Sequence, residues 1–144
     1  MGLDNLIILK LKRKLTVDDF ASEDEMIHVL NNTFIDCIAE NENEYEYTIC
    51  YWRKCWNIRD SIMDIIDDPN ADGAETEITR PQIESIRNEL FGYLVRGEGA
   101  WDESIWEFNE MIERLANDIV ALGWLERFMA RNTARCEVTF VDSY

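Results

Sequence analysis

The stretch that decides the fold lies near the end of the chain and reads Cys136-Glu137-Val138-Thr139-Phe140-Val141. Apolar and polar residues alternate along most of it, and this period of two predicts a β-strand. The segment 6–12 also ends in such an alternation, so we expect a second strand near the start of the chain. The segments between these strands have mainly helical patterns. We therefore predict an α+β fold in which the N- and C-terminal strands pair in a small sheet covered by helices.

Four segments carry apolar residues at steps of three and four, which is the spacing of one helix face. The expected helices cover residues 22–39, 51–66, 79–96 and 101–131. The second has a wide apolar stripe that includes Trp52 and Trp56, so it is expected to be largely enclosed. Gly123 is expected to bend or interrupt the last helix.

Two helix starts carry capping signals. Ser22 and Glu25 have the spacing of a capping box, and so do Thr79 and Gln82. Between the helices, residues 40–47 are polar and charge-dense and are expected to form a solvated connection. Residues 67–73 have the composition of a loop, and residues 75–78 are expected to form one short strand.

The size and composition of the chain favour one folded unit. It has 144 residues and a mass of 17.0 kDa, which is typical of one domain, and 47% of its residues are hydrophobic. It contains no internal repeat. Residues 1–144 are therefore expected to form a single domain.

The sequence offers no sign of export or membrane insertion. The longest apolar run, residues 119–125, is far shorter than the roughly 18 residues that span a bilayer. The first 14 residues place a short apolar stretch before their bases, the reverse of a secretory signal. The cysteines lack the C-x-x-C spacing of zinc sites and are expected to be reduced, buried thiols; they are Cys37, Cys50, Cys55 and Cys136. We expect a cytoplasmic protein without a membrane partner.

The chain is strongly acidic. It has 30 acidic and 14 basic residues, a formal net charge of −16 and a pI near 4.3. Because proteins bind nucleic acid largely through lysine and arginine, direct binding over a broad basic face is excluded. The acidity is regional, since residues 15–78 carry a net −14 and residues 98–118 a net −6.

No catalytic residue or cofactor is predicted. His28 is the sole histidine, and Cys37 lies nine residues further along the same expected helix, on a different face. The glycine motifs that hold phosphates and the G-x-S-x-G elbow are absent. Close pairs of carboxylates arise by chance among so many acids.

One local motif resembles half of a calcium loop. Asp68, Asn70 and Asp72 precede Gly73 at the spacing of the first calcium ligands, but Thr79 stands where the bidentate Glu is needed. An acidic turn explains the motif better, although a weak cation site stays open. No metal ligand is therefore assigned.

Three parts of the chain resemble a family of small proteins from tailed phages and prophages that have no established activity. They are the opening Met1-Gly2-Leu3-Asp4, the block Tyr51-Trp52-Arg53-Lys54-x-x-Asn57-Ile58 and the closing Asp142-Ser143-Tyr144. The resemblance implies that the protein acts during phage infection, and so in the cytoplasm of the host cell. Where members of that family often have a histidine, this chain has Arg59.

Two rows of carboxylates are the candidate partner-binding residues. They are Glu40, Glu42, Glu44 and Glu46 in the connection, and Glu103, Glu107 and Glu110 on the last helix. Such rows can present a charge array like that of a nucleic acid to a basic cleft, and Trp106 beside the second row would add an apolar contact. The plain alternative is a solvated acidic surface that serves solubility.

We therefore expect a non-enzymatic inhibitor that occupies the basic nucleic-acid-binding surface of a host defence or nucleic-acid-processing protein. Anti-CRISPR and anti-restriction proteins are of this kind. The alternative is a structural or assembly protein of the phage that self-associates through its helix faces, with no inhibitory role. Homo-oligomers are compatible with both.

Overall fold

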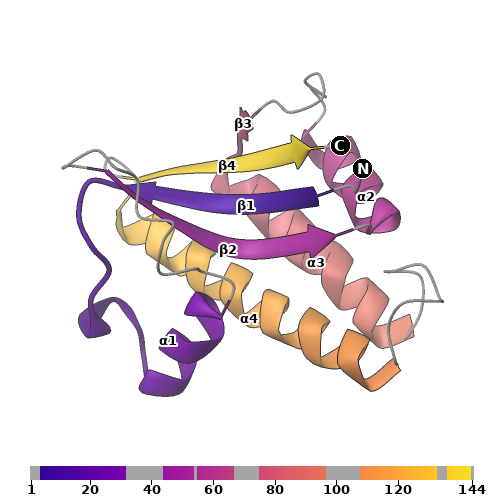
Figure 1. Cartoon of the computed structure of the whole chain (residues 1–144), viewed down its shortest axis with the longest axis horizontal. Coiled ribbons are helices and arrows are strands. Elements are labelled where there is room, and N and C mark those ends of the chain that lie inside the picture. Colours follow the sequence, from indigo (N-terminus) through magenta and orange to yellow (C-terminus); the bar gives the residue numbers. More distant parts are fainter. Residues whose placement is uncertain are drawn as a thin grey trace.

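The computed structural model describes residues 4–31, 44–53, 55–66, 75–96, 108–132 and 136–143. These residues form an α+β fold in which helices pack against one face of a four-stranded antiparallel sheet (Figure 1). The predicted fold class is therefore confirmed.

The sheet has the strand order β2-β1-β4-β3. The strands are β1 (Asp4–Leu11), β2 (Tyr45–Arg53), β3 (Glu75–Glu77) and β4 (Cys136–Ser143). β1 lies in the middle of the sheet and pairs with β2 on one side and β4 on the other. The predicted pairing of the two terminal strands is confirmed, and so is the short strand β3.

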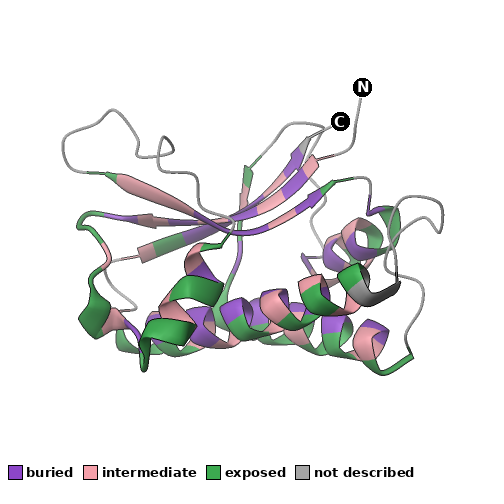
Figure 2. Ribbon diagram, turned by 60° about the horizontal axis from the view of Figure 1, so that its bottom comes forward, coloured by how far each residue is buried: buried purple, intermediate pink, exposed green. Residues whose placement is uncertain are grey.

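Burial alternates along β1. Asn5, Ile7, Leu9 and Leu11 are buried, whereas the residues between them are half-buried. Because side chains of a strand point alternately to the two faces, the buried set faces the helices. By the same alternation, Lys10 lies on the other face. None of the described helices covers that face (Figure 2).

The strand β2 is a correction to the prediction. We expected a solvated connection up to residue 47 and a helix from residue 51, but Tyr45–Arg53 is a strand and the helix begins at Trp56. The segment is rich in aromatic and β-branched residues, which favour strands. A register shift opposite Ile7 and Ile8 leaves Thr48, Ile49 and Cys50 buried in succession. The bulge therefore disrupts the alternation that would have identified the strand.

The helices lie together on one side of the sheet. They are α1 (Glu23–Leu30), α2 (Trp56–Ile66), α3 (Arg80–Arg96) and α4 (Phe108–Arg131), and a short 3-10 helix, η1 (Val17–Asp19), precedes α1. α4 continues through Gly123 to Arg131, so the helix is not interrupted there. The predicted continuation of the first helix to residue 39 and of the last one back to residue 101 lies outside the described residues.

Ser22 and Thr79 both cap their helices as predicted, and the full capping box forms at Thr79, whereas the Glu25 carboxylate accepts from the amide of Ala21 and not from that of Ser22. The amide of Glu25 donates to Ser22 Oγ over 3.1 Å, and the amide of Gln82 donates to Thr79 Oγ1 over 3.4 Å. Gln82 Oε1 accepts in return from the amide of Thr79 at 2.8 Å. These bonds satisfy backbone groups that a helix start leaves without partners.

The core lies between the sheet and the helices. Trp124 on α4 is fully buried and stacks on Phe20 and Phe128, with ring centroids 5.0 and 4.9 Å away. Trp52 is also fully buried, but Trp56 is 44% exposed, so the expected enclosure of that part of the helix was wrong. Among the described cysteines, Cys50 and Cys55 are buried and Cys136 is half-buried, and all three are free thiols.

Candidate protein-binding groove

A groove of about 610 Å³ runs between α1 and α4. Its lining includes Ile27, His28, Glu110, Glu113, Asn117 and Val120. Two of these side chains are aliphatic yet exposed, Ile27 at 57% and Val120 at 41%. Two are exposed carboxylates, Glu110 in the first turn of α4 and Glu113 one turn further along. The groove therefore combines apolar and acidic side chains.

Side chains of α4 hold α1 in place along the groove. Asn117 makes two bonds to His28, since its Oδ1 lies 2.8 Å from His28 Nδ1 and its Nδ2 donates to the His28 carbonyl over 3.2 Å. Because an amide oxygen only accepts, Nδ1 of His28 carries the proton. Further along, Arg127 Nη2 lies 2.7 Å from Glu25 Oε2. These contacts keep the two walls of the groove together.

Behind the groove, α4 is tied to the sheet through polar groups. Asp118 is fully buried and accepts a 2.9 Å hydrogen bond from Trp52 Nε1. Arg114 Nη2 donates over 2.7 Å to the carbonyl of Tyr51. Both Asp118 and Arg114 also line the groove. The bonds to β2 thus fix the part of α4 that carries Glu110 and Glu113.

Two of the described thiols are poor nucleophiles, the buried Cys50 behind the groove and the half-buried Cys136 at the start of β4. Burial raises the pKa of Cys50 well above its ordinary value, and the charge of Asp118 adds to this. Burial also raises the pKa of Cys136. Because the thiolate is the reactive form of cysteine, both groups stay protonated at neutral pH.

Of the three predicted binding residues that the structure describes, which are Glu44, Glu46 and Glu110, only Glu110 lines the groove. Glu46 lies on the opposite side of the molecule, on the sheet face away from the helices, where it is the direct cross-strand partner of Lys10. The structure therefore does not bring Glu46 and Glu110 into one patch. Glu44 is exposed just before β2. The other predicted residues lie outside the described residues; they are Glu40, Glu42, Glu103, Glu107 and Trp106.

Glu46 belongs to a charged cluster around Lys10. The Lys10 ammonium lies 2.8 Å from Glu75 Oε2 and 4.0 Å from Glu46 Oε1, and Glu137 stands opposite it in β4. The hydrogen bond to Glu75 raises the pKa of Lys10, and the charges of Glu46 and Glu137 act in the same direction. Glu46 is thus partly neutralised within the chain.

Sequence reasoning missed Glu113, Ile27 and Val120. Glu113 follows Glu110 by three residues, and this spacing extends the acidic ridge that the pattern already indicated. Ile27 belongs to the apolar residues at helical spacing in segment 22–39, a pattern that predicts burial, and its exposure shows that this prediction is wrong for Ile27. Val120 falls within the long apolar run, which predicts burial. The exposure of these apolar residues depends on how α1 packs on α4. The pattern of a short stretch of sequence does not indicate this packing.

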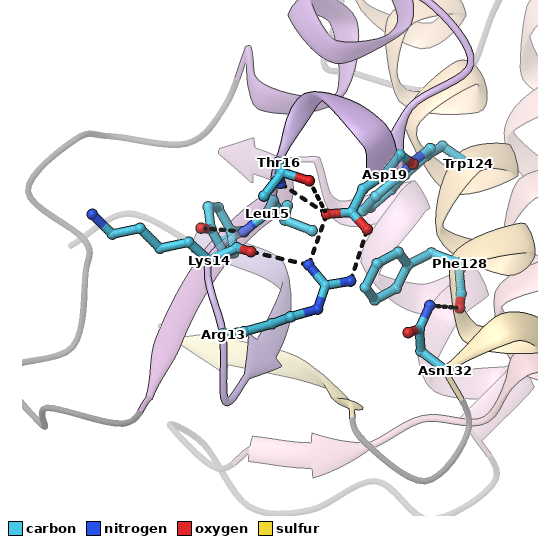
Figure 3. A network of polar contacts seen from close by, with 9 residues as sticks. Arg13, Lys14, Leu15, Thr16, Asp19, Trp124, Phe128 and Asn132 are labelled. Atoms are coloured by element: carbon cyan, nitrogen blue, oxygen red, sulfur yellow. Dashed lines mark hydrogen bonds and ion pairs between the residues drawn. The ribbon is translucent and has the colours of Figure 1, made fainter.

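A second pocket, of about 600 Å³, lies where β1 leaves the sheet. Its lining includes Lys10, Lys12, Arg13, Glu44, Phe128 and Glu137, so its charges are mixed. The guanidinium of Arg13 donates two hydrogen bonds, of 2.7 and 2.8 Å, to the carboxylate of Asp19 (Figure 3). The bond from Arg13 lowers the pKa of Asp19, which also accepts from the amide of Thr16.

The Arg13 network connects β1, η1 and α4. Trp124 Nε1 donates to the carbonyl of Asp19 over 2.8 Å, and the guanidinium of Arg13 lies 5.8 Å from the ring centre of Phe128 (Figure 3). The ammonium of the next residue, Lys14, lies over the ring of Tyr45. These contacts hold the segment before α1, so we assign the network a structural role.

Within the described ranges, no cluster of histidine, cysteine, aspartate or glutamate side chains is arranged to hold a metal ion. The half calcium loop around Asp68, Asn70 and Asp72 lies outside those ranges. None of the helices in the described part of the chain is long and apolar enough to cross a membrane. Comparison with models of known protein families, with curated proteins and with solved structures found no match.

Proposed function

We propose that this chain is a non-enzymatic protein-binding domain whose α1–α4 groove docks on the basic nucleic-acid-binding surface of another protein. The observation that carries the proposal is the composition of the groove. Glu110 and Glu113 offer exposed negative charge, and Ile27 and Val120 offer exposed aliphatic surface beside them. Protein interfaces typically combine an apolar centre with a polar rim.

The charge of the whole chain supports a cationic partner. A protein of net charge −16 attracts basic surfaces over long range and repels acidic ones. Basic surfaces of this kind are typical of proteins that hold nucleic acid. The resemblance to phage proteins suggests a host defence or nucleic-acid-processing protein as the target, which the acidic groove would inhibit by occupying its binding surface.

The construction of the groove also favours binding over catalysis. His28 and Asn117 are engaged with each other, and Asp118 accepts from Trp52. These polar groups hold the walls, while the exposed carboxylates and aliphatic side chains face outward. A rigid groove of this kind is preorganised for docking, which lowers the entropy lost on binding.

The test uses the immobilised chain and the DNA-cellulose-binding fraction of a bacterial extract. We expect the wild-type chain to retain a basic protein at about 50 mM salt, and duplex DNA to displace that protein by competition. Raising the salt should also release it, because charges separated by more than about 8–10 Å are screened at physiological ionic strength. The double variant Glu110→Lys/Glu113→Lys should lose the retained protein.

The matched control is Asp64→Lys/Glu84→Lys. These carboxylates are exposed on α2 and α3, away from the groove, and their reversal changes the net charge by the same amount. The control variant should retain most of the binding. Equal loss in both variants would show attraction by net charge alone, and retention that neither DNA nor salt reverses would contradict the proposal.

A further inference from the structure

The outward face of α3 carries exposed apolar side chains. Phe91 is 54% exposed and Val95, one turn further along, is 70% exposed. Single exposed apolar residues are common on protein surfaces, but two neighbours on one helix face form a patch. Neither residue lines the groove between α1 and α4.

Gly92 lies beside this patch, in the interior of α3. A glycine in the interior of a helix destabilises the helix relative to alanine. The three atoms nearest to a Cβ added at Gly92 would all belong to the guanidinium of Arg96, the closest at 3.1 Å. This contact is with a flexible side chain of the same helix, so packing within the chain does not require a glycine here. Close approach of another helix from outside would require one.

The charge of α3 differs from that of the whole chain. It carries three arginines and two glutamates, whereas the chain has a net charge of −16; the residues are Arg80, Arg87, Arg96, Glu84 and Glu89. Two copies of such an acidic chain repel each other over most of their surfaces. Arg87 is paired with Glu126 of α4, which leaves two arginines and two glutamates on α3. This helix is therefore close to neutral, and two copies that meet there repel each other less than they would over their acidic surfaces.

We propose that α3 is the contact surface of a homodimer in which two copies cross antiparallel at Gly92. In this arrangement the patch formed by Phe91 and Val95 of one chain packs on the same patch of the other, as in other two-fold interfaces. Glu89 lies about 4.5 Å before Gly92 along the helix axis and Arg96 about 6 Å after it. The two-fold axis therefore places Arg96 of each copy opposite Glu89 of the other, in two ion pairs at the rim.

This proposal is independent of the proposed function and has the opposite response to salt. Salt screens the repulsion between the two acidic chains, so it should strengthen the dimer, whereas it should weaken docking on a basic partner. The ion pairs at the rim contribute little to affinity when exposed. The two proposals can therefore fail separately.

The test is sedimentation equilibrium of the full chain over a range of concentrations, in about 0.05 M and about 1 M salt. We expect a mass approaching twice the 17.0 kDa of one chain, with tighter association at high salt. Phe91→Glu should raise the dissociation constant about tenfold or more, because it buries a charge in the centre of the contact. Val17→Glu is the matched control, since Val17 is 69% exposed on η1.

Two further variants test the geometry. Gly92→Ala should stabilise the monomer against urea yet weaken the dimer, a combination that a purely intrachain role of Gly92 does not produce. Glu89→Arg and Arg96→Glu should each weaken the dimer at low salt, and the double variant should restore it. A monomer under all conditions would overturn the proposal, and so would a dimer that Phe91→Glu weakens no more than Val17→Glu does.

Discussion

Arg59 in α2 holds Asp142 in β4 through two parallel hydrogen bonds, Nε to Oδ1 and Nη2 to Oδ2, each 2.9 Å long. Asn5 in β1 donates to the same carboxylate over 2.8 Å. Asp142 is only 3% exposed, so this ion pair connects α2 to the two central strands within the core. The guanidinium of Arg59 therefore has a structural role.

Replacing Arg59 should strongly destabilise the fold. Arg59→Met leaves the Asp142 carboxylate buried without its counter-charge, and the loss of one partner of a buried pair lowers the free energy of unfolding by about 3–5 kcal/mol. Urea denaturation at pH 7 measures this change. Arg131→Met, at an exposed position at the end of α4, should change the value by less than about 0.5 kcal/mol. Similar losses in both variants would contradict a special role of the pair.

The same pair should make stability depend on pH. Burial alone would raise the pKa of Asp142, but the bonds from Arg59 and Asn5 outweigh it and hold the pKa below its ordinary value. A carboxylate whose pKa is lower in the folded state stabilises that state above its unfolded pKa of about 3.9, and this contribution is lost as the pH falls through the folded value. Asp142→Asn should therefore be destabilising at pH 7 and closer to the wild type near pH 3, in urea denaturation at both pH values. An equal difference at both would refute the assignment.

The described thiols should differ in their reactivity. Cys50 and Cys55 are fully buried, and burial raises the pKa of Cys50 far more than that of the half-buried Cys136. Iodoacetamide labelling of the native protein, followed by peptide mass spectrometry, should therefore modify Cys136 first. In urea the three should react at similar rates. Early labelling of Cys50 in the native protein would contradict its placement against Asp118.

Removing the link between Asn117 and His28 should loosen α1. Asn117→Ala deletes both hydrogen bonds, and we expect a loss of about 1–2 kcal/mol and faster amide hydrogen exchange in α1. Exchange in α3 of the same sample is the internal control and should change little. Uniformly faster exchange across both helices would mean that the bonds support the whole fold instead of the groove.

The parts of the structure that rest on local signals were predictable. The alternation around Val138 predicted β4, and the capping residues Thr79 and Gln82 predicted the start of α3. β2 was missed because its bulge hides the alternation, and the bulge depends on pairing with Ile7 and Ile8, which lie 40 or more residues away in the sequence.

The candidate groove was predictable only in part. Spacing along one helix identified the acidic ridge that contains Glu110, since that property belongs to a single element. The exposure of Ile27 depends on how α1 sits against α4, and the bond from Arg59 to Asp142 joins residues 83 positions apart. Contacts of this range follow from the folded chain and have no signature in a short window of sequence.

The central place of β1 constrains how the protein matures. Asn5 meets its partner Asp142 across 137 positions, so a ribosome releases the first strand long before the neighbour that completes the middle of the sheet. Until β4 emerges, one long edge of β1 presents unsatisfied amides and carbonyls to any strand in the cell. Pairing at such long range also makes folding slow. Newly made chains should therefore depend on chaperones during synthesis.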